Sequence, residues 1–133
     1  MVNKSKKILT EISAGELLDK ISILEIKLDK IKDKESIEKI NNEYNLLKIT
    51  QNSSIKISEK LKKLFEQLKK VNLILWDIED KIRLCEKRKN FKETFIELAR
   101  DVYFNNDKRS KLKSEINEIL GSNIREVKKY TDY

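Results

Sequence analysis

Residues 61–85 read LKKLFEQLKKVNLILWDIEDKIRLC, and this stretch decides the fold. Its apolar side chains recur alternately three and four positions apart, at Leu61, Leu64, Leu68, Val71, Leu75, Ile78, Ile82 and Cys85. Side chains at that spacing lie on one side of an α-helix and pack against neighbouring helices as in a coiled coil. The sequence therefore predicts one long central helix over about residues 57–89, roughly 50 Å long at 1.5 Å per residue.

The segment before the long helix carries helical signals of its own. Ser13 and Glu16 form a capping box, in which both side chains accept hydrogen bonds from first-turn amides. Apolar stripes over residues 17–31 and 37–47 predict an N-terminal helical hairpin, with one bent helix as the open alternative. The polar residues 50–54 predict a turn before the long helix.

The segment after the long helix predicts shorter helices. Asn90 and Glu93 resemble a fresh cap, and residues 105–107, which read Asn-Asn-Asp, predict a further turn or cap. Gly121 stands where a glycine commonly ends a helix. These signals predict an all-α fold, a bundle of four to five helices built around the long one.

The length and composition agree with that fold class. The chain has 133 residues, of which 38% are apolar and 40% charged, and it contains no proline. Long amphipathic helices with charged outer faces fit this mixture, and the length suits a single domain over residues 1–133. We expect an N-terminal arm at 1–12 and a C-terminal tail at 122–133. Acids and bases are interleaved, so the net charge of +7 favours nucleic-acid binding only weakly.

The cysteine count and the absence of apolar runs predict a location. A lone cysteine, Cys85, cannot form an internal disulfide, which favours a reducing compartment. The N-terminus lacks the apolar segment of a signal peptide, and no apolar run approaches the roughly 18 residues of a membrane span. We therefore expect a cytoplasmic protein without a membrane span.

The residue types present limit the chemistry. The chain has no histidine, one cysteine and two glycines. Histidine-dependent nucleophilic catalysis, structural zinc sites and glycine-rich phosphate loops are thereby excluded. We expect no cofactor, assign no catalytic residue or metal ligand, and lean toward a protein that is not an enzyme.

Ten residues of the second half are candidates for a ligand site or a protein interface. Tryptophan and arginine are common at interface hot spots, and acids repeated every four residues on a helix repel one another, which often marks a functional site. The structural alternative is a solvated helix face for the acids, a bundle-edge position covered by the C-terminal helices for Trp76, and a helix cap or an ion pair for the asparagines and Arg100. The candidates are Trp76, Glu79, Asp80, Arg83, Glu97, Arg100, Asp101, Asn105, Asn106 and Arg109.

Four segments resemble a family of small bacterial proteins of unknown function. They read SAGELLDKISILEIKLDKI at 13–31, LWDIEDKIRLCE at 75–86, FIELARDVYFNNDKRSKLKSEIN at 95–117 and GSNIREVKKY at 121–130. The resemblance spans most of the chain and is weakest in the middle. It implies no activity and assigns no site residue.

The sequence leaves three functional hypotheses. The leading one is a non-enzymatic protein-interaction or scaffold module, with a protein partner or self-association, because a long apolar seam is combined with few catalytic residue types. The second is a small carboxylate- and Mg²⁺-dependent enzyme, or an anion-binding protein, that uses an Asp/Glu/Arg cluster. The third, which is not favoured, is weak nucleic-acid binding through lysine clusters.

Overall fold

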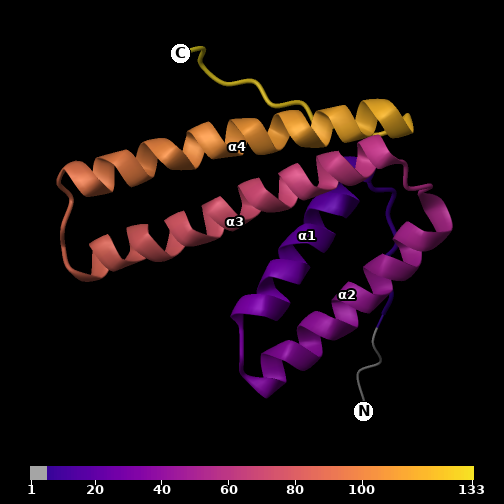
Figure 1. The fold of residues 1–133 in the computed structure, drawn as a ribbon, viewed down its shortest axis with the longest axis horizontal. Helices are drawn as coiled ribbons and strands as arrows, with labels where there is room; N and C mark the ends of the chain where they lie inside the picture. Colours follow the sequence, from indigo (N-terminus) through magenta and orange to yellow (C-terminus); the bar gives the residue numbers. More distant parts are fainter. Residues whose placement is uncertain (1–5) are drawn as a thin grey trace.

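The computed structural model describes residues 6–133, which form four α-helices and no strand (Figure 1). The helices are α1 (Ala14–Lys30), α2 (Lys34–Ser54), α3 (Glu59–Lys87) and α4 (Glu93–Leu120). The predicted all-α class is confirmed. The first five residues of the N-terminal arm expected at 1–12 lie outside the described residues.

Two predicted turns are wrong, because the polar side chains there form hydrogen bonds within continuous helices. Helix α2 continues through residues 50–54, where the Thr50 hydroxyl donates to the Leu46 carbonyl at 3.3 Å. Helix α4 continues through residues 105–107, where the Asn105 amide donates to the Asp101 carbonyl at 2.8 Å. Hydrogen bonds to the preceding turn are an alternative to capping for such residues. The C-terminal segment thus forms a single helix of 28 residues.

Most helix ends carry recognisable caps. Ser13 begins α1 as predicted, and its hydroxyl accepts from the amide of Glu16 at 3.2 Å. Asp33 caps α2 and Ser58 caps α3 in the same manner. Helix α4 begins after Lys92, two residues later than predicted, without a side-chain cap. It ends at Gly121, which has the expected left-handed conformation (φ 62°).

Helix α1 lies against each of the other three helices, and the core forms where they meet. The buried side chains of this core come from α1, α3 and α4, and are Leu17, Leu18, Ile21, Leu61, Leu64, Leu68 and Ile116. Helix α2 contributes partly buried side chains such as Tyr44 and Leu47. The core therefore occupies one end of the molecule, where α1 crosses α3 and α4.

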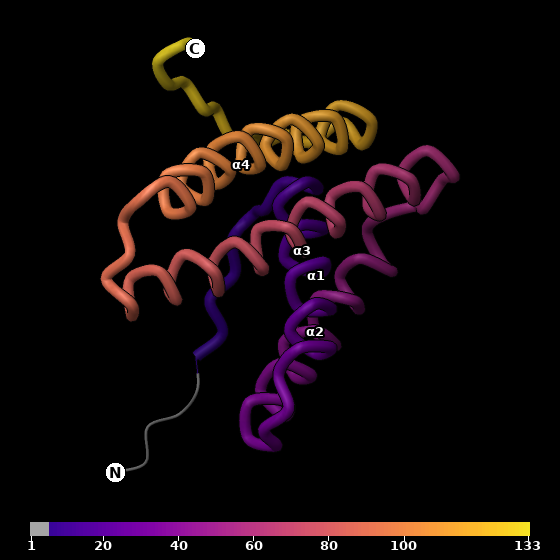
Figure 2. The backbone as a smooth tube through the Cα atoms, turned by 60° about the vertical axis from the view of Figure 1, so that its left-hand side comes forward, coloured from indigo at the N-terminus to yellow at the C-terminus, as the bar shows by residue number. Residues whose placement is uncertain are grey.

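Beyond α1, helices α3 and α4 continue together as a two-helix projection, which we call the arm (residues 73–108). Figures 1 and 2 show that its far end extends past α1 and α2. Leu61 and Leu68 at the core end are 0% exposed, whereas Leu75 and Ile82 on the arm are half-buried. Ile78 and Cys85 remain buried in the seam between α3 and α4. The arm thus has one buried seam and lacks the third helix that completes the core.

The crossing of α1 over α4 depends on Gly15. The Gly15 amide donates to Asn117 Oδ1 at 2.6 Å, and the Ala14 amide donates to Ser122 Oγ at 3.0 Å. A Cβ atom at residue 15 would lie 2.5 Å from the Lys113 carbonyl oxygen and 2.9 Å from Asn117 Oδ1. The side-chain oxygens of α4 and the residues after it therefore cap α1, and this approach requires a glycine.

We predict that Gly15→Ala destabilises the protein by about 1–3 kcal/mol, because the added methyl overlaps a backbone carbonyl that is held in a helix. Without that overlap, the higher helix propensity of alanine would raise stability. Urea unfolding followed by circular dichroism measures the change. Lys20→Ala, at an exposed position of α1, is the control and is expected to change stability by less than about 0.5 kcal/mol. A Gly15→Ala variant as stable as the wild type would contradict the close crossing.

Candidate functional site

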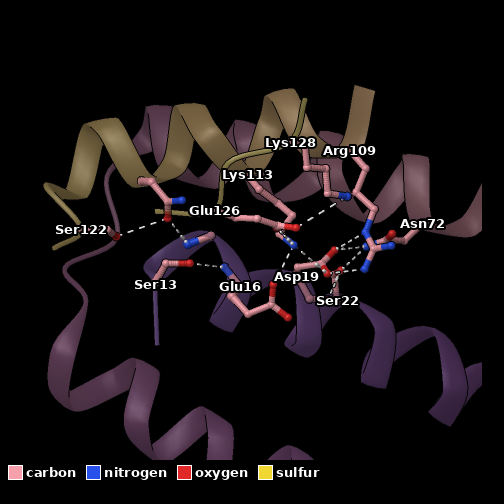
Figure 3. A network of polar contacts seen from close by, with 12 residues as sticks. Ser13, Glu16, Asp19, Ser22, Asn72, Arg109, Lys113, Ser122, Glu126 and Lys128 are labelled. Carbon is pink, nitrogen blue, oxygen red and sulfur yellow. Dashed lines mark hydrogen bonds and ion pairs between the residues drawn. The ribbon is translucent and has the colours of Figure 1, made fainter. Parts of the chain in front are cut away.

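A buried ion pair joins α1 to α4 (Figure 3). Asp19, on the inner side of α1, is 1% exposed. Its Oδ1 accepts from Arg109 Nε at 2.9 Å, and its Oδ2 accepts from Arg109 Nη2 at 2.5 Å. Two parallel hydrogen bonds are the strong form of the arginine–carboxylate contact and restrict the orientation of both groups.

Helix α3 joins the same carboxylate through Asn72. Its side-chain amide donates to Asp19 Oδ1 at 2.9 Å and to Ser22 Oγ at 2.8 Å. The Ser22 hydroxyl in turn donates to the Asp19 backbone carbonyl at 2.7 Å. Within residues 6–133 no buried side-chain nitrogen or oxygen lacks a hydrogen-bond partner. The polar centre of the bundle is therefore fully satisfied.

Lys113 extends the network toward solvent. Its ammonium group lies 2.7 Å from Glu16, 3.8 Å from Asp19 and 3.5 Å from Glu126, and Lys128 lies 3.9 Å from Glu126. Glu16 thus pairs with a lysine instead of completing the predicted capping box. The network contains three acids and three bases, so its charges balance. We interpret it as a structural connection between α1, α3, α4 and the C-terminal tail.

The network holds Asp19 in its charged form. Burial by itself would raise the pKa of Asp19, but hydrogen bonds from Arg109 and Asn72, with the charges of Arg109 and Lys113, outweigh burial and lower it. The hydrogen bond to Asp19 is the main reason that the pKa of Arg109 is raised. Each partner thus favours the charged state of the other.

The C-terminal tail lies along α4 and forms one wall of a groove. The Tyr133 hydroxyl donates to the Asp107 carboxylate, which raises the pKa of Tyr133 to about 12. The Tyr133 ring packs edge-on against Tyr103, with centroids 5.4 Å apart. The groove between tail and α4 has a volume of about 1340 Å³, and Asn106 and Lys113 are among its lining residues.

The ten candidate residues occupy different surroundings. Arg109 belongs to the buried network, Asn106 lines the groove, and Asn105 is buried with its amide turned to its own helix. Arg100 lies over the Phe104 ring, 5.5 Å from the ring centroid. The role proposed for these residues stays a prediction.

The other six candidates also lie on the arm, as do Arg100, Asn105 and Asn106. Glu79 and Arg83 form an exposed pair at 3.2 Å, and Trp76 is half-buried. The three remaining side chains are exposed acids, namely Asp80, Glu97 and Asp101. In the part of the chain that the structure describes, no group of three or more His, Cys, Asp or Glu side chains could hold a metal ion.

At the core end of α3 and α4, helix α1 covers one surface of this helix pair. The same surface continues along the arm, where we call it the open face. On α3, Trp76, Glu79 and Arg83 follow Asn72 at intervals of four, seven and eleven residues, which keep them on one side of the helix. On α4, side chains at similar intervals before Arg109 are apolar. Within α4 they are Phe95, Leu98 and Val102, which are half-buried. Phe91 precedes the first residue of α4 and is 48% exposed. The face that binds α1 at the core end is therefore not covered by a third helix along the arm.

Sequence reasoning missed Asp19, Ser22, Glu126 and Ser122 as members of the network. Asp19 lies inside the apolar stripe of residues 17–31, and its position directly after Leu17 and Leu18 was its one local signal. Its partner Arg109 is 90 residues away, so the pair could not be read from local spacing.

We predict that Asp19→Asn destabilises the protein by about 3 kcal/mol at pH 7, because Arg109 and Lys113 lose the buried charge that balances them. Thermal and urea unfolding measure the loss. Glu35→Gln is the control, since Glu35 pairs with Lys39 on the surface and both side chains are largely exposed, and it should cost less than about 0.5 kcal/mol. Equal effects of the two substitutions would contradict a central role for Asp19.

The lowered pKa of Asp19 predicts an acid-dependent loss of stability. A group whose pKa is lower in the folded state stabilises the fold above its unfolded value, about 3.9, and that contribution disappears as pH falls through the folded value. The difference in unfolding free energy between the wild type and Asp19→Asn should therefore be largest near pH 7 and shrink below about pH 4. Urea titrations from pH 7 to 2.5 test this, and a difference independent of pH would refute it.

Comparisons with known proteins identify a family whose function is unknown. No curated protein and no solved structure matches the chain. No helix among residues 6–133 is long and apolar enough to cross a membrane. A family described as "Family of unknown function (DUF6165)" matches residues 8–132. The chain belongs to this family of unknown function.

Proposed function

We propose that the protein is a non-enzymatic interaction or scaffold module whose contact surface is the open face of the arm. The module consists of a base, where the α1–α2 hairpin packs on a long central helix, and an arm that presents its open face to a protein partner. We further propose that it acts in the cytoplasm, as its single cysteine suggests.

The observation that carries the proposal is the change in burial along one surface. At the base, α1 covers Asn72 and Arg109. Toward the tip, the same side of α4 carries Phe95, Leu98 and Val102, which are only half-buried. Apolar side chains that stay only partly covered on one surface favour an interaction site there.

The chemistry of the open face resembles that of known interface centres. It combines the chain's single tryptophan, Trp76, with an arginine, a phenylalanine, a leucine and a valine. Tryptophan and arginine are enriched among interface hot spots, and apolar neighbours exclude water around them. A helix from a partner can lie in this position as α1 does at the base, because two helices expose a groove that a third can fill.

We predict that Leu98→Glu weakens association of the protein at least tenfold. A charged side chain in the centre of the open face would have to be desolvated on binding. Sedimentation velocity over a concentration series measures association, and the emission of Trp76 reports contact at the same face. Circular dichroism establishes that the variant is folded.

Ile96→Glu is the matched control. Ile96 is 54% exposed on the same helix, and its two-residue offset from Leu98 turns it to the opposite side of α4. We expect Ile96→Glu to associate as the wild type does. A wild-type protein that sediments as a monomer at every concentration, with Trp76 emission independent of concentration, would contradict self-association through the open face.

A further inference from the structure

We infer that the tip of the arm docks on an anionic lipid surface. The tip is the connection between α3 and α4, residues 87–92, which read Lys-Arg-Lys-Asn-Phe-Lys. It is a different surface from the open face, so the inference goes beyond the proposed function. It rests on the position of the tip in the fold, on its charge and on its exposed phenylalanine.

The tip lies at one end of the molecule. Figure 1 shows the α3–α4 connection at an extreme of the longest axis, beyond α1 and α2. Hydrogen bonds define its conformation. The Asn90 amide donates to the Cys85 carbonyl at 2.9 Å, and Asn90 Oδ1 accepts from the Lys92 amide at 3.2 Å. The tip can therefore touch a flat surface by itself, and such a contact requires little ordering of the connection.

The tip is basic. It contains four exposed bases and no acid. Residues 86–93, which add one acid on each side, still carry a net charge of +2 from four bases and two acids. Lys89 pairs with Glu86 at 3.1 Å, whereas the other three bases form no ion pair within residues 6–133. Exposed clusters of this kind are attracted to anionic headgroups. The tip bases are Lys87, Arg88, Lys89 and Lys92.

Phe91 adds an apolar group among these bases. Its side chain is 48% exposed, and its ring packs edge-on against Phe95, with centroids 5.4 Å apart. Segments that lie in a membrane interface combine bases with aromatic side chains, because the ring enters the acyl boundary while the charges stay at the headgroups. The tip thus places electrostatic attraction and shallow apolar insertion at the same point.

The arm behind the tip has the opposite net charge. Residues 77–85 and 94–104 carry five acids and three bases, a net charge of −2. An anionic surface attracts the tip and repels this part of the arm, so the arm approaches tip first instead of side-on. A nucleic acid fits less well, because its phosphates would continue from the tip along a net-negative segment. A plane of lipid headgroups needs the tip alone.

Cosedimentation with lipid vesicles tests the inference. The wild type should bind vesicles of equal parts phosphatidylglycerol and phosphatidylcholine in low salt, and should not bind vesicles of phosphatidylcholine alone. Lys87→Gln/Arg88→Gln/Lys92→Gln should lower the partition coefficient on the order of a hundredfold, at about fivefold for each base removed. Circular dichroism establishes that the variant is folded.

Lys60→Gln/Lys62→Gln/Lys63→Gln is the matched control. These three lysines are exposed at the core end of α3, so the control removes the same charge from the opposite end of the helix. It should bind within about threefold of the wild type, because salt screens charges that lie more than about 10 Å from the surface. Equal losses in the two triple variants would overturn the inference, since the net charge of the whole molecule would then explain binding.

Tryptophan emission tests the orientation. In a Trp76→Phe/Phe91→Trp variant the single tryptophan stands at the tip, and its emission should shift to shorter wavelength on anionic vesicles as the ring leaves water. In the wild type, Trp76 lies eleven residues before Lys87, roughly 16 Å along α3, and its emission should not shift. A shift for Trp76 without one at position 91 would overturn docking by the tip.

Single-stranded oligonucleotides distinguish a phosphate chain from a lipid surface. If the wild type bound an oligonucleotide more tightly than anionic vesicles, and the tip variant lost that binding, a nucleic acid would replace the lipid surface and the inference would be wrong. Absence of wild-type binding to anionic vesicles would also overturn it. Vesicle binding is measured without a protein partner, and association through the open face is measured without lipid. Either proposal can therefore fail while the other stands.

Discussion

The bidentate contact between Asp19 and Arg109 is the interaction on which the arrangement of the helices depends. A carboxylate on the buried side of a helix is stable only when its partners occupy defined positions, because an unpaired buried charge costs several kcal/mol. Asn72 and Arg109 must therefore reach the same point from α3 and α4. That requirement sets the rotation of both helices about their axes, and the rotation determines which side chains the arm presents beyond α1.

The fold class was predictable because helical periodicity is a local property. The apolar spacing from Leu61 to Cys85 is visible without any knowledge of tertiary contacts. The helix boundaries at residues 50–54 and 105–107 were wrong for an equally local reason. Thr50 and Asn105 are residue types that are common in turns. Here the side chain of each donates a hydrogen bond to a carbonyl of its own helix. Composition alone does not distinguish these two uses of a polar side chain.

The site was less predictable than the fold. Arg109 was identified as a candidate because it is an arginine within a polar run, but its partner Asp19 looks in the sequence like one more polar position on an amphipathic helix. Gly15 has no local sequence signal for its role, whereas the structure requires a glycine there for the approach of α4. The Asp19–Arg109 contact and the requirement for Gly15 both depend on residues about 100 positions apart. The spacing within a single helix does not predict such contacts.

Cys85 makes local opening of the arm accessible to chemical measurement. The thiol is 8% exposed and lies in the seam between α3 and α4, near the tip and away from the Asp19 network. A reagent can reach it when the seam opens locally, without unfolding of the base, because cooperative units of one protein open with different free energies. The rate at which a thiol reagent modifies Cys85 therefore measures how often the arm opens. Comparing that rate with the rate of global unfolding distinguishes opening of the arm from unfolding of the core.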